Sequence, residues 1–389
     1  MNVPKLRFKE FTDEWKQTPL KNIIYSNIIE APKPTTDYIR LGIRSHCKGT
    51  FHELVKIENI LSADKMYIVP KNNLILNITF AWEQAIAITD DNDEGKYISN
   101  RFPTFAFKDN QLPTFYKYII PQKRLKYDLN VASPGGAGRN RVLNKKLFLS
   151  IPVNIPLLKE QEKIAKFLTT VDKKITNLEN TITSLENQKK GLLQQIFSQK
   201  LRFKDKNGNN YPNWEKKKLE DISNITMGQS PDSDFVNTEK IGTPFLQGNA
   251  EFTNKYPIEK YWCTKPQKIA NPTDILLSVR APVGAINIAN KKFCIGRGLS
   301  AISFNCNKLF GKYNLEFNLF QLIKKSQGST FSSINKKDIS EIILFIPCLE
   351  EQTKIADFLS AFDRKLENQK AQLEHWKQIK KGLLQQMFV

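Results

Sequence analysis

One long segment occurs twice in this chain. Residues 156–197 (PLLKEQEKIAKFLTTVDKKITNLENTITSLENQKKGLLQQIF) align without a gap onto residues 347–388 at an offset of 191, with 20 of the 42 positions identical. A shorter repeat precedes each copy: the sequence KLRFK at 5–9 returns at 200–204, followed by Trp15 and Trp214. Internal repeats constrain architecture before any local pattern does. The chain of 389 residues is therefore a tandem duplication of a unit of about 195 residues, the distance between the two KLRFK segments.

The repeated segments have the spacing of coiled-coil helices. Apolar residues recur at alternating steps of four and three, the a and d positions of a heptad, and a lysine interrupts both copies at the equivalent place, Lys189 and Lys380. Each helix of about 39 residues would be about 58 Å long, too long for one domain of this size to bury. The predicted seam consists of Ile164, Leu168, Val171, Ile175, Leu178 and Leu185 in the first copy and Ile355, Leu359, Phe362, Leu366, Leu373 and Trp376 in the second.

We expect the two helices to pair with each other, antiparallel and related by a pseudo-two-fold axis, so that they set the distance between two globular domains. The alternative is that the seams are the cores of two unrelated helical hairpins. The helices start after Pro156 and Pro347, where Glu160-Gln161 and Glu351-Gln352 suit the positive end of a helix dipole. Gly191 and Gly382 lie inside the pattern and suggest a bend or a close contact there.

The segments between these helices predict two mixed α/β (α+β) domains. Short apolar runs at 73–78 and 274–279 occupy equivalent places and are typical of buried strands, as are residues 38–42 and 243–247. Strand-like runs at 148–152 and 342–347 follow the related tetrapeptides LNKK and INKK. The predicted boundaries are a first recognition domain at 1–155, a helical region at 156–199, a second recognition domain at 200–346 and a second helical region at 347–389.

The charge balance indicates a polyanionic partner. The 59 Lys and Arg residues against 39 Asp and Glu give a net charge of +20, spread over the whole length. Nucleic acid is the leading candidate, because an acidic membrane would favour one concentrated basic face or an amphipathic anchor. No apolar run approaches a membrane span and Met1–Lys5 opens no signal-peptide core, so we expect a cytoplasmic protein with no membrane partner.

The sequence offers little support for a metal site. Its five cysteines form no CxxC pair, and we expect them to be reduced thiols. His46, Cys47 and His52 lie close together in the sequence, but a fourth ligand at usable spacing is missing, so no bound metal is expected.

Glycine-bearing polar loops at 133–141 and 327–333 are candidates for DNA contacts. Such loops let the backbone approach phosphate while side chains reach base edges, although an ordinary surface loop is the alternative for each residue. Because the two loop sets differ, we expect the domains to read two different short sequences. The candidate DNA-binding residues, chosen by charge, loop context and repeat alignment, are Arg44, Arg139, Arg141, Lys145, Arg280, Arg297, Lys336 and Lys337.

Catalytic motifs are missing from the sequence. Asn271-Pro272-Thr273-Asp274 lacks the second proline and the aromatic residue of a DNA methyltransferase motif, and no Walker A loop occurs. Pro231-Asp232 is not followed by an acid-x-Lys nuclease pair before the second long helix, and the three histidines lie near no nucleophile elbow. We expect no intrinsic enzymatic activity and no catalytic residues.

The chain resembles the specificity subunits of type I restriction-modification systems. The resemblance rests on the tandem P-x-L-x-E-Q-x-K-I-A-x-F-L segments, the K-K-G-L-L-Q-Q-x-F ends, the KLRFK repeat and the two divergent domains. It implies two target recognition domains, each binding one half of a split asymmetric site in double-stranded DNA. It also implies that the helices set the spacer and dock two modification subunits, which use S-adenosylmethionine to methylate adenine, and that restriction subunits use ATP and Mg. This chain would bind none of these cofactors. The alternative is a coiled-coil DNA-binding scaffold or repressor that acts without such partners.

Overall fold

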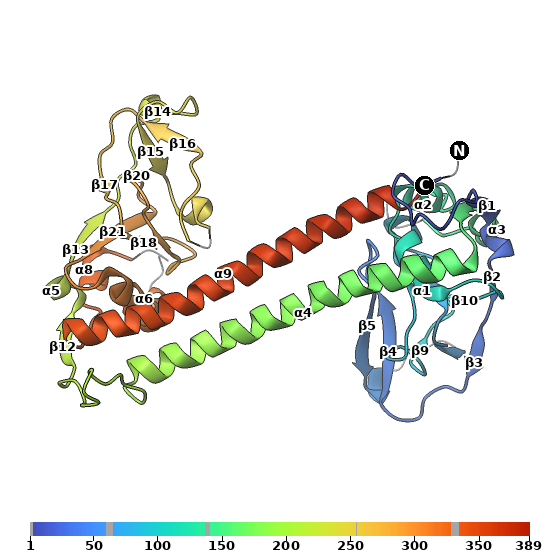
Figure 1. Ribbon diagram of the computed structural model, residues 1–389, viewed down its shortest axis with the longest axis horizontal. Coiled ribbons are helices and arrows are strands. Elements are labelled where there is room, and N and C mark those ends of the chain that lie inside the picture. The colour runs from blue at the N-terminus through green and yellow to red at the C-terminus, as the bar shows by residue number, and fades with distance from the viewer. Residues whose placement is uncertain (1–2, 60–64, 137–140, 254, 328–333) are drawn as a thin grey trace. The chain divides into compact units, whose positions relative to one another are not determined.

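The computed structural model describes residues 3–59, 65–136, 141–253, 255–327 and 334–389, without the side chains of 325–327. The chain divides into two compact units, Met1–Glu179 with Gln372–Val389 and Asn180–Ala371. Each unit contains one globular domain, here called domain 1 or domain 2, together with one half of each long helix. The helices are α4 (Leu158–Phe197) and α9 (Leu349–Gln386), each continuous over its length (Figure 1).

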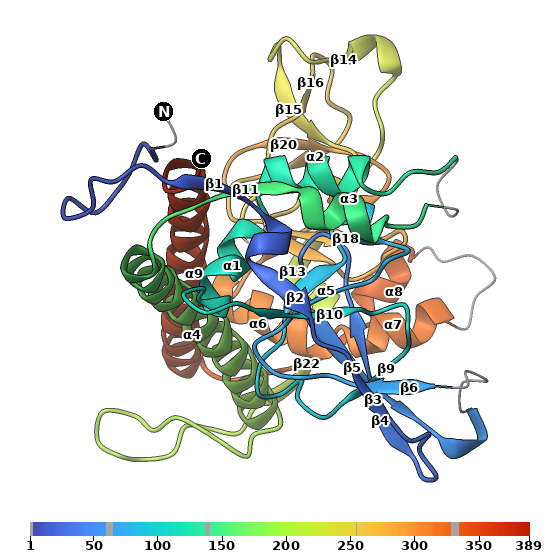
Figure 2. The same cartoon turned by 90° about the vertical axis from the view of Figure 1, so that its right-hand side faces the viewer.

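Domain 1 is built on three antiparallel or mixed sheets (Figure 2). A two-stranded sheet joins β1 to β11, a four-stranded sheet has the order β2-β10-β7-β8, and a five-stranded sheet has the order β3-β6-β9-β4-β5. Only β4 and β9 in the last sheet run parallel. The strands are β1 (Lys16–Pro19), β2 (Ile24–Ser26), β3 (Ile29–Ala31), β4 (Tyr38–Ile43), β5 (Thr50–Val55), β6 (Met66–Ile68), β7 (Leu74–Leu76), β8 (Ile86–Ile88), β9 (Tyr97–Ile98), β10 (Thr104–Phe107) and β11 (Pro152–Ile155), and the helices are α1 (Pro113–Ile119), α2 (Lys123–Val131) and α3 (Lys145–Ser150).

Domain 2 repeats this arrangement. Its sheets have the orders β12-β22, β13-β21-β18-β19 and β14-β16-β15-β20-β17, and β15 runs parallel to β20 as β4 does to β9. The strands are β12 (Glu215–Lys218), β13 (Ser223–Met227), β14 (Val236–Asn237), β15 (Thr243–Leu246), β16 (Tyr261–Cys263), β17 (Ile269–Ala270), β18 (Ile275–Ser278), β19 (Ile286–Ile288), β20 (Phe293–Ile295), β21 (Leu299–Phe304) and β22 (Ile343–Ile346), and the helices are α5 (Leu219–Ile222), α6 (Lys308–Asn318), α7 (Phe320–Gln327) and α8 (Lys336–Ser340).

The strands expected from the apolar runs are present, with one error. Strands β7 and β18 are buried along their whole length, as expected for β7, which is wholly apolar, and for β18, which is apolar up to Ser278. The prediction of a strand at 148–152 was wrong, because Phe148 lies in α3 and the strand begins at Pro152. Asn144 is the N-cap residue of helix α3, and its side chain accepts hydrogen bonds from the backbone N–H groups of Lys146 and Leu147. The repeated tetrapeptide is therefore a helix start, since Asn335 caps α8 in domain 2.

The KLRFK repeat, the repeated tryptophan and the repeated Glu-Gln dipeptide meet in one contact. Arg7 donates from Nε and Nη2 to the two carboxylate oxygens of Glu160, both at 2.8 Å, and Trp15 Nε1 donates to Glu160 Oε1 at 3.3 Å. Glu160 is 2% exposed, and the hydrogen bonds from Arg7 to it raise the pKa of Arg7. The acidic residue thus binds the preceding globular domain, a role that the helix-dipole interpretation alone did not predict.

The same contact recurs in domain 2. Arg202 donates to the two oxygens of Glu351 at 3.1 and 2.7 Å, and Trp214 Nε1 donates to Glu351 Oε2 at 3.0 Å. The neighbouring glutamines also match, since Gln161 and Gln352 each donate to the carbonyl of the proline that precedes the helix. The buried bidentate pair therefore fixes the first turn of each long helix on its own domain.

Each long helix ends in the core of the other copy's domain. The last turn of α4 places Ile196 and Phe197 in the core of domain 2, where Phe197 contacts Trp214 and Phe310 at ring centroid distances of 6.2 and 5.7 Å. Met387 and Phe388, which follow α9, lie in the core of domain 1, where Phe388 contacts Trp15 at 6.0 Å. The helix-end motif KKGLLQQ-x-F thus places its phenylalanine in the aromatic core of a domain, and we call Phe197 and Phe388 the helix-end plugs.

The two long helices pack together within each unit. In the first unit Lys377 pairs with Glu179 at 2.8 Å and Lys380 with Asp172 at 2.7 Å. In the second, Lys370 pairs with Glu186 at 2.7 Å and Lys189 with Asp363 at 2.6 Å. The pairs show that the two helices run antiparallel, and the pairs of one unit correspond to those of the other when the two helices are exchanged. The helices therefore pair with each other and are not the cores of two unrelated hairpins.

The predicted seam residues divide between helix pairing and domain cores. Leu178 and Leu185 in the middle of α4 are buried, whereas Leu366, Leu373 and Trp376 of α9 are half-buried. The first seam positions of each helix pack into the adjacent domain core: Ile164, Leu168, Ile355 and Leu359. Of the two expectations for Gly191 and Gly382, a bend or a close contact, the close contact was wrong, because a Cβ atom at either position would meet nothing within 4 Å.

Candidate nucleic-acid interface

Two of the candidate arginines line one polar concavity in domain 2. Arg280 follows β18, and Arg297 lies in the turn between β20 and β21. Together with the end of β15 and its following turn they surround a volume of about 210 Å³. The full lining is Ser230, Gln247, Gly248, Asn249, Arg280, Ala281, Arg297 and Gly298, here called the arginine pocket.

Glycines set the shape of the arginine pocket. A Cβ atom at Gly296 would lie 3.0 Å from the Cα of Gln247, and one at Gly298 would lie 2.7 Å from the Gln247 carbonyl oxygen. A Cβ at Gly228 would lie 2.1 Å from the Gly296 carbonyl oxygen. The turn that carries Arg297 is therefore packed directly against the neighbouring backbone, which leaves no room for a side chain at these three positions.

Neither guanidinium of the arginine pocket has an interaction with another described residue. Both arginines are exposed, and no hydrogen bond or ion pair found in the described ranges involves their side chains. The backbone N–H of Arg297 donates to Ser230 Oγ at 3.2 Å. Arg202 in the same unit differs from these two arginines, because its guanidinium forms an ion pair with Glu351. Within the ranges that the structure describes, Arg280 and Arg297 are therefore exposed cations without an anionic partner at the rim of a polar concavity.

The lining chemistry suits the edges of nucleic-acid bases and the phosphate backbone. Arginine forms a bidentate pair with guanine O6 and N7, and glutamine or asparagine forms one with adenine. Gln247 and Asn249 supply the amides, and Ser230 supplies a hydroxyl. These three residues were missed by the sequence analysis. The signal that could have found them is the string QGN at 247–249, polar residues around a glycine directly after a predicted strand.

The candidate arginines of domain 1 have intramolecular partners instead. Arg44 donates to the Thr50 carbonyl at 2.6 Å and lies over the Phe51 ring. Arg141 donates to the carbonyls of Ser133 and Asn130 at 2.9 and 2.7 Å, and its guanidinium lies 5.1 Å from the Trp82 ring centroid. Arg139 lies outside the described residues. The structure thus gives Arg141 a role in holding its own loop.

The remaining candidates are lysines on the two short helices capped by asparagine. Lys145, exposed at the start of α3, places its ammonium 5.5 Å from the Phe105 ring centroid. Lys336 and Lys337 are exposed in the first turn of α8. Lys337 lies 4.0 Å from Glu341, and Lys336 has no ion pair with any residue that the structure describes. These lysines can neutralise phosphate.

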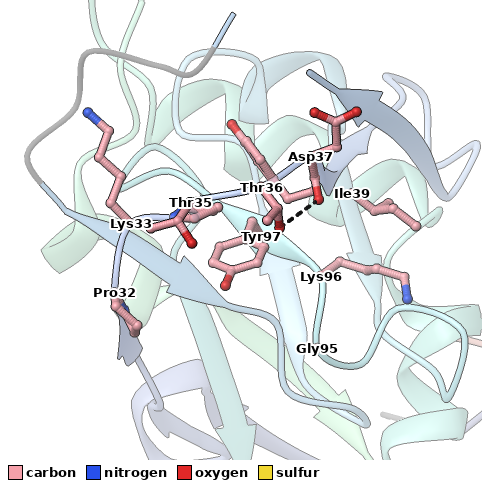
Figure 3. A pocket seen from close by; sticks show the side chains of 11 residues that line it. Pro32, Lys33, Thr35, Thr36, Asp37, Ile39, Gly95, Lys96 and Tyr97 are labelled. Atoms are coloured by element: carbon pink, nitrogen blue, oxygen red, sulfur yellow. Dashed lines mark hydrogen bonds between the residues drawn. The ribbon is translucent and has the colours of Figure 1, made fainter. Parts of the chain in front are cut away.

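Domain 1 has a concavity of another kind, of about 470 Å³, along the segment before β4 and the start of β9 (Figure 3). The Tyr97 ring lies at its centre with Thr35 and Thr36 beside it. The ammonium groups of Lys33 and Lys96 lie at opposite ends and point away from the ring (Figure 3). This concavity therefore has aromatic and hydroxyl groups without converging cations, unlike the arginine pocket.

Comparison with known proteins places this geometry in a family. The family model described as "Type I restriction modification DNA specificity domain" matches twice, at residues 17–187 and 211–375. The putative type I restriction enzyme MjaX specificity subunit of Methanocaldococcus jannaschii is 38% identical over 98% of this chain and 95% of the relative. This chain belongs to the family of type I restriction-modification specificity subunits. The MjaVIII specificity subunit of the same organism is 24% identical over 91% of this chain and 84% of its own.

Solved structures share the fold of this specificity subunit. The type I restriction-modification S subunit from M. genitalium aligns over 100% of this chain and 99% of its own, with a TM-score of 0.65 and 15% identity. A chain from a study of complex assembly and conformational transition of the type I R-M system aligns over 95% of this chain and 96% of its own, with a TM-score of 0.59 and 24% identity.

As a specificity subunit, the chain is the non-catalytic, DNA-specifying component of its restriction-modification complex. In the described part of the chain, no group of three or more His, Cys, Asp or Glu residues is placed to hold a metal ion. None of the helices in the described ranges is long and apolar enough to cross a membrane.

Proposed function

We propose that domains 1 and 2 are target recognition domains that each bind one half of a split, asymmetric site in double-stranded DNA. The paired helices α4 and α9 set the unspecified spacer between the halves. The subunit directs adenine methylation by two modification subunits and cleavage by restriction subunits. S-adenosylmethionine, ATP and Mg bind to those partners and not to this chain.

The arginine pocket is the observation that carries this proposal. In this pocket, two exposed guanidinium groups without partners among the described residues lie beside amide and hydroxyl groups. The backbone around them is packed so closely that three glycine positions leave no room for a side chain. A fixed concavity of this composition can discriminate between base edges, whereas scattered surface lysines bind phosphate without reading sequence. The net charge of +20 supplies the attraction to the duplex.

The difference between the two domains supports an asymmetric site. Identical recognition surfaces in a tandem repeat would read a palindrome. Here the arginines of domain 2 are free of partners within the described residues, whereas Arg44 and Arg141 of domain 1 bind backbone carbonyls. The two halves of the DNA site are therefore expected to differ in sequence.

The test is to co-express the chain with a competent modification subunit and to map methylated adenines in the host genome by single-molecule sequencing. The expected result is one split, asymmetric motif with a constant gap. Absence of methylation from a complex that forms with an active modification subunit contradicts the proposal. That outcome favours a coiled-coil scaffold or repressor that binds DNA without methylating partners.

A further inference from the structure

Besides its apolar contacts with the domain core, each long helix makes polar contacts with its own domain at two places along its length. The first is the buried carboxylate in the first turn, Glu160 or Glu351. The second lies twelve residues further along, at Asp172 in α4 and Asp363 in α9. At the helical rise these two attachments are about 18 Å apart. The apolar contacts of the first helical turns with the domain core lie near the first attachment, and the second attachment adds a polar contact further along that helps to fix the direction of the helix on its domain.

The second attachment in the first unit joins three elements. Tyr118, on α1 of domain 1, donates its hydroxyl hydrogen to Asp172 Oδ2 at 2.9 Å. The other oxygen of Asp172 pairs with Lys380 Nζ of α9 at 2.7 Å. One carboxylate on α4 therefore binds the domain with one oxygen and the partner helix with the other.

The second unit repeats this trio with the helices exchanged. Tyr313, on α6 of domain 2, donates to Asp363 Oδ2 at 2.7 Å, and Asp363 Oδ1 pairs with Lys189 Nζ of α4 at 2.6 Å. Lys189 and Lys380 are the two lysines that interrupt the heptad seam. Their interruption is explained, because each reaches the aspartate that holds the opposite copy's domain.

The chemistry of the trio favours one geometry. Burial raises the pKa of both tyrosine hydroxyls, so each remains a hydrogen-bond donor over the working pH range. The side chains of Lys189 and Asp363 are only 19% and 26% exposed. If the two helices shifted in register, each of these partly desolvated charges would lose its partner, which is unfavourable. Polar groups inside a coiled-coil seam select register at some loss of stability.

We propose that Tyr118, Asp172 and Lys380, and likewise Tyr313, Asp363 and Lys189, are positioning residues that fix the direction of each recognition domain on the paired helices. They thereby determine which spacer lengths the subunit accepts between the two half-sites. This inference rests on the proposed function, in which the two domains each bind one half of a split DNA site. It goes beyond that proposed function because it assigns spacer selectivity to six named residues and not to helix length alone.

The test uses the full chain assembled with its modification subunits and carrying Tyr313→Phe or, separately, Asp363→Asn. Binding is measured to duplexes with the native spacer, with one base pair more or less, and with a single half-site. A hydrogen bond to a charged group contributes about 1.5–3 kcal/mol, so the preference for the native spacer is expected to fall about tenfold or more. Affinity for a single half-site should not change.

The matched control is Lys370→Met, which removes the ion pair to Glu186 between the same two helices but touches no recognition domain. It should leave the spacer preference intact. Because Tyr313→Phe loses a hydrogen bond in the folded state, its melting temperature is compared first, and all binding is measured at a temperature at which this variant and the control are fully folded.

Three results overturn the inference. The first is an unchanged spacer preference in both variants. The second is an equal loss of affinity for half-sites and full sites, which indicates a structural role only. The third is a wild-type complex whose affinity does not depend on spacer length, which would also contradict the proposal of a split DNA site. The first two results would leave that proposal unaffected.

Discussion

The two recognition domains agree where they hold the long helices and differ where they carry candidate DNA contacts. Both use an Arg-Glu-Trp cluster and a Tyr-Asp-Lys trio at equivalent positions. Their five-stranded sheets differ at the edge: domain 1 adds β3 beside β6, whereas domain 2 adds β14 beside β16, at the other side of the sheet. The helix attachments are duplicated and the recognition surfaces are not, as expected if the partners of the helices are constant and the DNA half-sites vary.

The arginines show the same division. Arg7 and Arg202 are equivalent and make the same bidentate pair with a buried glutamate. The guanidinium groups of Arg280 and Arg297 in domain 2 have no partner among the described residues. The candidate arginines of domain 1, Arg44 and Arg141, instead donate hydrogen bonds to backbone carbonyls. A recognition surface can therefore be replaced without disturbing the attachment of the domain to its helix.

The largest effect is expected from breaking a duplicated attachment. Glu351→Ala leaves Arg202 and the Trp214 N–H without their acceptor, and loss of one partner of a buried ion pair costs about 3–5 kcal/mol. Glu160→Ala should lower the free energy of unfolding similarly, because Arg7 and Trp15 make the same contacts. Urea unfolding of the full chain measures both.

The control for this pair is Glu350→Ala, an exposed neighbour in the same helical turn. It should change the free energy of unfolding by less than about 0.5 kcal/mol. A large loss for Glu351→Ala with none for Glu160→Ala would show that the two attachments are not energetically equivalent.

A somewhat smaller effect is expected from removing the helix-end plugs. Phe388→Ala and Phe197→Ala should each destabilise by about 3 kcal/mol, the lower end for a buried phenylalanine. Phe388 is 9% exposed and Phe197 is 5% exposed, so the two losses should be close. Thermal unfolding is the measurement, with Val389→Ala as control because that side chain is 47% exposed. Equal stability of Phe388→Ala and wild type would contradict the role of the C-terminal plug.

The contrast between the recognition surfaces predicts different outcomes for arginine substitutions. Arg280→Ala or Arg297→Ala should lower discrimination at one position of the second half-site by about 1–3 kcal/mol, without loss of thermal stability. Arg297→Lys keeps the charge but loses the bidentate geometry, so it should retain affinity better than sequence discrimination. Binding to a panel of single-base variants of the methylated motif measures both.

In domain 1 the expected result is reversed. Arg141→Ala removes two hydrogen bonds to backbone carbonyls and should destabilise the domain by about 1–3 kcal/mol. If Arg141→Ala instead changes base preference at full stability, then domain 1 also reads DNA through this arginine, and the contrast between the domains is smaller than the contacts indicate.

The effect that is smallest near neutral pH concerns two half-buried thiols, one in each domain. Burial raises the pKa of Cys47 to about 12 and that of Cys306 to about 11, from an ordinary value of 9.0. Between pH 9 and these values the unfolded chain loses the thiol protons and the folded chain keeps them, so stability should fall as pH rises through this window. Cys47→Ser and Cys306→Ser should flatten this part of the stability profile. Rapid alkylation of either thiol in the folded protein at pH 8, compared with the unfolded protein, would contradict it.

Much of the fold was predictable from local patterns. The heptad spacing predicted both long helices, whose observed ends lie close to the repeat boundaries, and the apolar runs predicted β7 and β18. The error at 148–152 has a local cause, because the apolar residues Phe148, Leu149 and Ile151 suggested a strand while the asparagine cap four residues earlier started a helix. Arg280 and Arg297 were found as candidates, but their neighbours Gln247 and Asn249 were not.

The sequence by itself determined that the protein is a duplicated unit with long paired helices, a strong positive charge and two divergent domains, because repeats, periodicity and composition are properties of the linear chain. Only the tertiary structure decided what the repeated residues do. Glu160 meets an arginine 153 positions away, and the seam lysines meet aspartates on the other helix. Such contacts depend on the chain folding back on itself, so neither spacing nor residue type could assign the partner.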